Sequence, residues 1–303
     1  MTTGWTALAF RPPTVLKRLR RGSRACPLAL RDVAGGLVSE DAVIPVVLAP
    51  SVAVARAALL AAKAAGSVLG LEAPAGEPPE RWFDAVTAVA DELAPGLPLL
   101  LGATVVLQPG GVAAARALRL AHRLVEAGIT HLVLDVDALE PDRRADEVAR
   151  AAEPALERGL GVECLLPGPA AGLPGVDGAL SLLSELASLG ASPELAGVRC
   201  PAPRDGVEAA GQARALEALA DASAGAAICR RGSGAGRLLR RVRRGALRAC
   251  DDGAAVAAQA ALEPDPERAE ARAYGEVGAL VDATRSAGSA RTLSAALERA
   301  REG

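Results

Sequence analysis

The segment best suited to chemistry is an arginine-containing apolar run that enters a glycine–serine turn and then a helix. Its sequence, ICRRGSG, supplies five candidate phosphate-binding residues: Arg230, Arg231, Gly232, Ser233 and Gly234. Unpaired backbone N–H groups and the helix dipole favour an anion at such a turn, and guanidinium groups suit phosphate oxygens. The alternative, which we favour, is an empty turn whose arginines pair with Asp251 and Asp252 of the next apolar run, because these carboxylates would repel an anion.

Three further carboxylates, Glu72, Asp135 and Asp137, stand at the ends of apolar runs. Carboxylate oxygens are the ligands that Mg²⁺ prefers, and a spacing of two would place Asp135 and Asp137 on one face of a strand. This spacing is also common where no metal binds, so we assign no metal site. Neither histidine suits a metal site or a general base, because His122 falls within an expected helix and His131 at the start of a strand. We expect both histidines to be structural.

The elements that would position these residues alternate along the chain. Eight apolar runs of strand type are each followed by a segment of helical pattern, at intervals of about 30 residues. The runs cover residues 42–50, 67–74, 97–107, 130–139, 160–169, 195–203, 225–234 and 246–253. Strands separated by single helices predict a parallel sheet, and eight such units predict a (β/α)8 TIM-type barrel. A doubly wound open sheet is the alternative.

The chain is expected to form a single domain with two additions to its core. An N-terminal arm covers residues 1–40, the barrel core residues 41–255, and C-terminal helices that pack on the barrel residues 256–303. Half of the 303 residues are hydrophobic and only 2% are aromatic, so the core is built from Leu, Val and Ala. The net charge of −2 argues against nucleic-acid binding. Five cysteines without CxxC spacing, and no membrane-span pattern, predict a reduced, cytoplasmic protein.

Several segments together resemble a known family. Four stretches are similar, in chain order, to segments of class II, metal-dependent sugar-bisphosphate aldolases: VLGLEAPAG, LPLLLGATVVLQPGG, RLVEAGITHLVLDVDAL, and ICRRGSG followed by RRGALRACDDG. The tagatose-bisphosphate aldolase non-catalytic-subunit branch is the most similar in pattern. The resemblance covers residues from about 40 to 255. It implies a barrel, a zinc site and aldol cleavage at the carboxyl ends of the strands.

The residues on which that chemistry depends are replaced. In the frame of the family, the proton-handling aspartate falls on Thr104, metal-binding histidines fall on Val105 and Arg230, and an asparagine falls on Cys250. The run at 160–169 also lacks the expected histidine. Without a Lewis acid, nothing stabilises the enediolate of an aldol cleavage. We therefore expect no aldolase activity, no catalytic residue, no metal and no cofactor.

A helix rich in arginine follows the glycine–serine turn. Four of its residues share one broad side and are candidates for binding a protein partner with an acidic surface: Arg237, Arg240, Arg241 and Arg244. A solvated outer helix is the plain alternative. The sequence favours a catalytically inactive aldolase-like barrel that acts as a protein-binding, scaffolding or regulatory subunit, and it leaves a homo-oligomer open. The second interpretation is a phosphate- or small-molecule-binding protein, or an enzyme whose chemistry has moved to the strand-end carboxylates.

Overall fold

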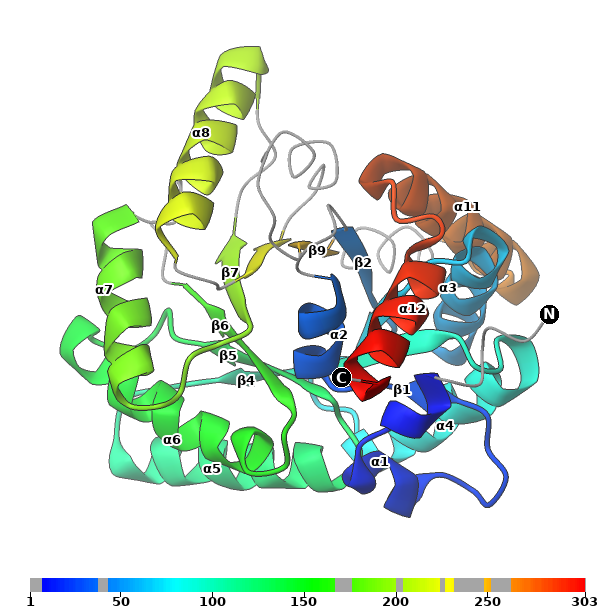
Figure 1. Cartoon of the computed structure of the whole chain (residues 1–303), viewed down its shortest axis with the longest axis horizontal. Helices are drawn as coiled ribbons and strands as arrows, with labels where there is room; N and C mark the ends of the chain where they lie inside the picture. The colour runs from blue at the N-terminus through cyan, green and yellow to red at the C-terminus, as the bar shows by residue number, and fades with distance from the viewer. Residues whose placement is uncertain are drawn as a thin grey trace.

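The computed structural model describes residues 7–37, 43–166, 176–199, 204–223, 227–231, 248–251 and 263–302. Within these ranges the chain is an α/β protein with one parallel sheet and helices around it (Figure 1). The predicted α/β class and parallel sheet are confirmed. We call the two ends of the sheet the carboxyl-end face and the amino-end face, after the strand ends that lie there.

The sheet contains all eight expected strands and one that the sequence did not indicate. The strands are β1 Cys26–Pro27, β2 Val43–Leu48, β3 Leu69–Glu72, β4 Pro98–Val106, β5 His131–Asp135, β6 Gly161–Leu165, β7 Leu195–Arg199, β8 Ala227–Arg231 and β9 Arg248–Asp251. The strands are shorter than the apolar runs that predicted them, because each run extends into the neighbouring loops. Strand β1 pairs with the start of β4 through only two residues, which is too short to give a pattern.

The strands pair in the order β1-β4-β3-β2-β9-β8-β7-β6-β5, and β5 also pairs with β4. Every one of these pairings is parallel. Because parallel strands place their carboxyl ends together, residues that end different strands meet at the carboxyl-end face. Register then decides which of them share one face of the sheet.

Helices follow strands β2 to β7 as expected, the segment after β8 lies outside the described residues, and further helices lie towards both ends of the chain. The described helices are η1 Ala7–Phe10, α1 Pro13–Arg18, α2 Leu30–Leu37, α3 Val52–Ala65, α4 Pro79–Leu93, α5 Gly111–Glu126, η2 Pro141–Arg143, α6 Arg144–Leu156, α7 Val176–Ser188, α8 Gly206–Ala222, α11 Pro266–Thr284 and α12 Ser289–Glu302. Local sequence fixes their ends. Ser51 caps α3 by accepting a hydrogen bond from the Val54 N–H, and Gly66 ends it with a φ of 62°.

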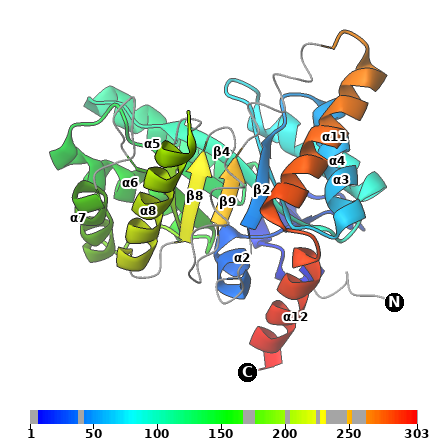
Figure 2. The same cartoon turned by 90° about the horizontal axis from the view of Figure 1, so that it is seen from above.

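The N-terminal arm and helix α12 cover the amino-end face, whereas α11 lies beside α3. Helix α2 lies against the start of β6, where Leu30 packs so closely on Gly161 that a Cβ atom there would lie 2.3 Å from Leu30 Cβ. Helix α11 packs along α3 and reaches β2, and α12 packs on α2. Figures 1 and 2 show α2 and α12 on the same side of the sheet. The arm and the C-terminal helices therefore pack on the same sheet as the central βα units.

Buried hydroxyl groups attach the C-terminal helices to the turn between α3 and β3. Ser67 Oγ donates to Ser286 Oγ at 2.9 Å, and the Val68 N–H donates to Ser289 Oγ at 2.9 Å. The Thr284 hydroxyl lies 3.1 Å from Ser286 Oγ. Since all of these hydroxyls are buried, each bond replaces water that has been excluded. Within the described ranges, no helix combines the length and apolar character that crossing a bilayer requires.

Candidate functional site

The candidate site lies at the carboxyl-end face, where several strands end in polar residues. Glu72 ends β3, Asp135 ends β5 and Arg199 ends β7, while Thr104 lies near the end of β4. Strand pairing places Glu72 beside Gly102 and Val106 beside Asp135, so these polar side chains lie at the same end of the sheet, and we call them the carboxyl-end cluster. The structure thus brings all three predicted carboxylates to the same end of the sheet, with Asp137 in the turn that follows β5.

Glu72 is held by the residue that replaces the aspartate of the aldolase pattern. The Thr104 hydroxyl donates a short hydrogen bond to Glu72 Oε1, and Glu72 is only 7% exposed. Val105, at the position of a metal-binding histidine in the family, is fully buried and belongs to the apolar core. Its register partner is Leu134, which is buried as well. A side chain at position 105 therefore packs in the core, whereas Thr104 meets the carboxylate.

Arg199 joins the two remaining carboxylates. Its Nη2 atom lies 2.7 Å from Asp135 Oδ2, and its Nη1 atom contacts Asp137 Oδ2. The side chains of Arg199 and Asp137 are each 43% exposed, against 12% for Asp135. The expectation that Asp135 and Asp137 share a strand face needs correction, because β5 ends at Asp135 and Asp137 lies in the following turn. The guanidinium group, and not the strand, brings them together.

This arrangement does not fit the metal that the aldolase resemblance implies. Across the described part of the chain, no three His, Cys, Asp or Glu side chains gather as a set of metal ligands. Thr104 and Val105 supply neither an imidazole nor a carboxylate. Asp135 and Asp137 direct their oxygens at Arg199, so a cation between them would have to displace a guanidinium group. We therefore derive no chemical step through a metal.

A buried His–Glu pair lies within the sheet, and the sequence analysis missed it. His131 Nε2 is 3.0 Å from Glu163 Oε2, and the contact is not a hydrogen bond. The two side chains are 2% and 0% exposed. Glycines make room for them, since a Cβ atom at Gly197 would lie 2.3 Å from Glu163 Oε1. A glutamate inside the apolar run GVECL was the available signal, because a buried carboxylate needs a partner. His122 is exposed on α5.

Cys26 and Cys164 do not offer nucleophiles. Both are free and buried, and burial raises the pKa of each thiol to about 12. The carboxylates of Glu163 and Asp135 add to this effect at Cys164. A thiol with such a pKa carries almost no thiolate near neutral pH, and the thiolate is the reactive form.

Most of the predicted phosphate and partner sites lie outside the described residues. These are Gly232, Ser233, Gly234, Arg237, Arg240, Arg241 and Arg244, together with Asp252. Arg230, Arg231 and Asp251 are described by their backbone. Arg231 is the register partner of both Arg199 and Asp251, so the start of the predicted phosphate turn lies beside the carboxyl-end cluster.

Comparison with known proteins supports the fold. No protein-family model and no curated protein matches the chain. Among solved structures, the YdjI aldolase from Escherichia coli K12 superposes with a TM-score of 0.67 at 10% identity, covering 86% of this chain and 99% of that one. The fructose-bisphosphate aldolase from Campylobacter jejuni gives 0.63 at 12% identity, with coverage of 86% and 96%.

A third similar structure is the probable tagatose 6 phosphate kinase from Sinorhizobium meliloti 1021, with a TM-score of 0.55, 16% identity and coverage of 86% and 98%. At these identities the likeness concerns fold alone. The resemblance to the aldolase superfamily that the sequence motifs indicate is confirmed at that level.

Proposed function

We propose that the chain is a complete (β/α)8 barrel without aldolase activity, which acts as a protein-binding, scaffolding or regulatory subunit in the cytoplasm. The closed form is supported by the pairings, which run from β4 through β3, β2, β9, β8, β7, β6 and β5 and return to β4. The superposition on aldolases, which covers 86% of this chain, supports it as well. In this fold, chemistry is placed at the carboxyl-end face.

One observation carries the loss of activity: the side chains at the positions of the family's proton carrier and metal ligand are a hydroxyl bonded to Glu72 and a buried valine. An alcohol cannot exchange protons as a carboxylate does at neutral pH. A Schiff base would need a lysine at this face. Lys17 lies in α1, and Lys63 donates to the Leu93 carbonyl at the amino-end face. Neither of the chain's two lysines is in reach.

Exposed valines at the carboxyl-end face support the protein-binding half of the proposal. Val112 is 86% exposed and Val207 is 79% exposed, at the starts of α5 and α8. Val52 and Val106 are each about half exposed beside β2 and β4. Aliphatic side chains that face water around the ends of the strands suit contact with another protein better than contact with a phosphorylated sugar.

Purified protein tests the loss of activity. We expect elemental analysis to find less than about 0.1 zinc per chain, which is adventitious binding only, because the histidine ligands of the family are replaced. We expect no release of triose phosphate from fructose 1,6-bisphosphate or tagatose 1,6-bisphosphate, even with zinc added. Glu72→Gln serves as the matched variant. Turnover in the wild type that Glu72→Gln removes, or one zinc per chain, would overturn the proposal.

Charge introduced at the valines tests partner binding. A protein that copurifies from native lysate is first identified and then titrated against variants. Val106→Glu combined with Val112→Glu should weaken its binding at least tenfold, because two carboxylates would be desolvated at the interface. Leu120→Glu is the control, since Leu120 is also exposed on α5 but lies away from the carboxyl-end face. Equal binding by all three proteins would exclude this surface.

The second interpretation, a phosphate-binding protein or an enzyme with relocated carboxylate chemistry, makes a different forecast. The observation in its favour is that Arg231 lies in register with Arg199, which would place two arginines at the carboxyl-end face. Fructose 1,6-bisphosphate would then raise the melting temperature, and Gly232→Asp would remove the rise. Binding of an acidic partner through Arg240 and Arg244 is tested separately by replacing both with Glu. This double variant should bind the partner more weakly, and its binding should depend less on salt.

A further inference from the structure

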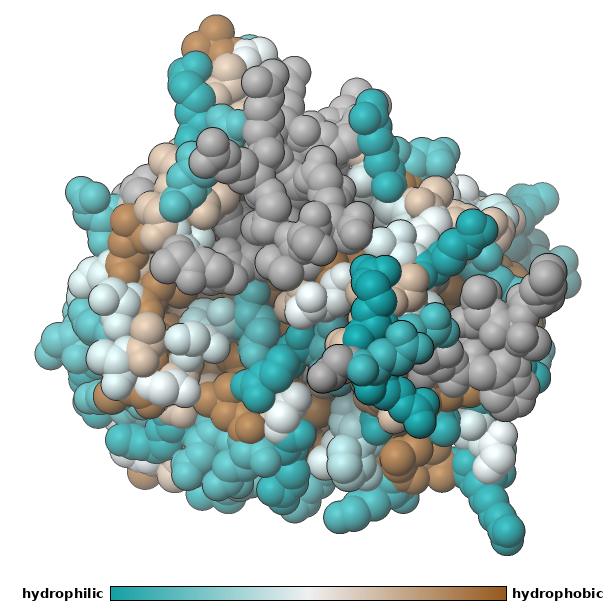
Figure 3. All heavy atoms as spheres, viewed as in Figure 1, coloured by the Kyte–Doolittle hydropathy of each residue, from teal (hydrophilic) through white to brown (hydrophobic). Residues whose placement is uncertain are grey.

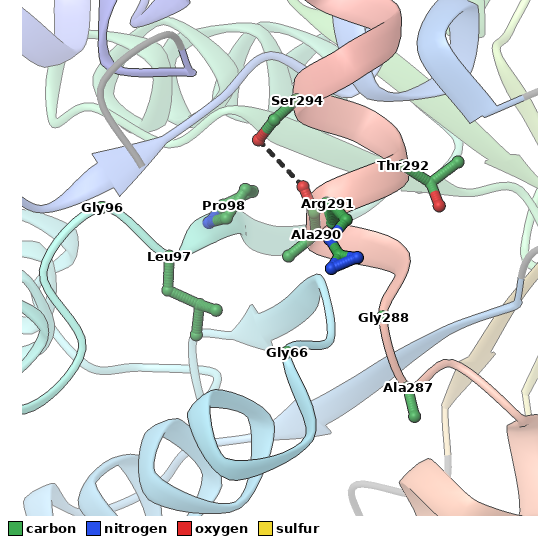
Figure 4. Close-up of a pocket in the computed structure, with 10 residues that line it drawn as sticks. All are labelled: Gly66, Gly96, Leu97, Pro98, Ala287, Gly288, Ala290, Arg291, Thr292 and Ser294. Atoms are coloured by element: carbon green, nitrogen blue, oxygen red, sulfur yellow. Dashed lines mark hydrogen bonds between the residues drawn. The ribbon is translucent and has the colours of Figure 1, made fainter. Parts of the chain in front are cut away.

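We propose that a pocket at the amino-end face, between α12 and the start of β4, binds a small amphipathic carboxylate. The pocket has a volume of about 640 Å³, which lies in the range of small-molecule sites. Figure 4 shows Leu97 and Pro98 facing the first turn of α12 across it, with Gly66 below and Gly288 in the loop that leads into α12. This inference goes beyond the proposed function, which concerns the opposite face.

One wall of the pocket is formed by apolar side chains. Leu97 and Pro98 are buried in the fold, and Ala290 faces them from α12. The rest of the wall is largely bare backbone. Gly66 and Gly288 have φ angles of 62° and 82°, in a backbone region that residues with a side chain rarely adopt. A Cβ atom at Gly288 would meet nothing within 4 Å, so the absence of side chains keeps this space open.

The charge of the pocket has one sign. Arg291 is the single charged residue among the described residues that line it, and no carboxylate lines it. Its guanidinium group is exposed and has no ion-pair partner in the part of the chain that the structure describes. Thr292 adds a hydroxyl at the edge. Figure 3, which views this face, shows hydrophilic side chains gathered over α12.

The backbone of the first turn of α12 is already engaged. The Ala290 N–H donates to the Gly66 carbonyl at 3.0 Å, and the Arg291 N–H donates to the Gly288 carbonyl at 3.0 Å. An anion would therefore be met by the Arg291 side chain and not by helix amides. A guanidinium fork pairs with the two oxygens of a carboxylate, while the wall formed by Leu97, Pro98 and Ala290 covers an apolar body.

Three probes separate the two parts of the proposed ligand: octanoate, 1-octanol with the same body and no charge, and inorganic phosphate with charge and no body. We expect saturable binding of octanoate by calorimetry, and binding at least tenfold weaker for 1-octanol and for phosphate. Arg291→Gln should weaken octanoate binding at least tenfold. Arg299→Gln, on the exposed last turn of the same helix, should leave it unchanged.

The proposal is overturned if octanoate does not saturate, if 1-octanol binds equally well, or if Arg291→Gln and Arg299→Gln behave alike. Because Arg291 is exposed, its replacement should not unfold the protein, which circular dichroism of each variant checks. The result is independent of the aldolase assay and of the valine variants, which probe the carboxyl-end face. Failure of one set of experiments therefore leaves the other set interpretable.

Discussion

The two ends of the sheet use polar groups in opposite ways. At the amino-end face, Ser67, Ser286 and Ser289 form short hydrogen bonds between neutral groups that are fully covered by α11, α12 and the α3–β3 turn. At the carboxyl-end face, Arg199 pairs with Asp135 and Asp137 while nearly half of its side chain remains in water. A buried hydrogen bond left unmade costs about 1–3 kcal/mol, whereas an exposed ion pair contributes about 0–1 kcal/mol.

The difference separates buried contacts that fix the fold from exposed polar groups on one scaffold. At the amino-end face, a substitution either leaves a buried polar group without its partner or makes atoms overlap. At the carboxyl-end face, water already reaches Arg199, Asp137 and the exposed valines, so that these side chains can be exchanged or covered at small cost. Such a division is expected where loops at the strand ends vary in function while the opposite face maintains the fold.

The largest effect should come from filling the contact between β6 and α2. Gly161→Val would place atoms within 2.3 Å of Leu30 Cβ and 2.8 Å of the Arg31 backbone nitrogen, and backbone cannot move aside as a side chain does. We expect the free energy of unfolding to fall by about 3 kcal/mol or more, measured by urea titration.

Gly211→Ala is the control, because a Cβ atom there meets nothing within 4 Å and the position is helical. It should raise stability by up to about 1 kcal/mol. Equal stability of Gly161→Val and the wild type would show that α2 is not fixed on the sheet.

The next effect concerns the buried hydroxyls. Ser286→Ala removes the group that Ser67 and Thr284 contact, and should lower the free energy of unfolding by about 1–3 kcal/mol. Because the groups are neutral and buried, we expect the same loss at low salt and in 1 M NaCl. Ser188→Ala is the matched control, since the Ser188 hydroxyl bonds to the Glu185 carbonyl at an exposed site. A loss that disappears in salt would contradict the neutral, buried character of this face.

Much of the fold could be predicted from the sequence, because it depends on local patterns. Eight apolar runs separated by helical segments give the parallel sheet, and Ser51 and Gly66 mark the ends of α3. Strand β1 could not be found in this way, since two residues have no periodicity. The α2 contact at Gly161 depends on a close approach between segments about 130 residues apart in sequence. No local sequence window covers such a distance.

The candidate site was less predictable, because its contacts depend on strand register and one of them, Arg199 with Asp135, joins strands that are not neighbours. Glu72 and Asp135 could be assigned to strand ends, yet their partners Thr104 and Arg199 follow only from the register. Arg199 did carry a signal, as the charged last residue of the apolar run LAGVR. Strand β6 separates it from β5, so nothing in the sequence indicated that its partner would be Asp135.

A smaller effect should appear at alkaline pH. The pKa values of Cys26 and Cys164 are about 12 in the folded state, above an ordinary value of 9.0, because burial disfavours the thiolate. The unfolded chain therefore loses these protons first as the pH rises. Their contribution to stability is complete below pH 9 and declines between about pH 9 and 12, by about 1.4 kcal/mol per pH unit for each thiol.

Urea titrations at pH 8 and pH 10 measure this decline. Cys26→Ala and Cys164→Ala lower stability at both pH values through lost packing, so the difference between the two pH values is compared. Each replacement should reduce that difference by about 1.4 kcal/mol. A difference that neither replacement changes would mean that the thiols are accessible to water in the native state.

The smallest effect should come from Arg199, and it tests the comparison most directly. Arg199→Gln removes the charge that Asp135 and Asp137 share, at a site where water competes for both partners. We expect the free energy of unfolding to fall by no more than about 1 kcal/mol at low salt, and the loss to vanish in 1 M NaCl, where screening reduces the interaction in the wild type as well. Asp135 is the more buried partner, so part of the loss would reflect its unpaired charge, and Asp135→Asn added to Arg199→Gln should restore that part. If Arg199→Gln costs as much as Ser286→Ala and the cost persists in salt, the carboxyl-end cluster is a structural element of the fold, and the division between the two faces does not hold.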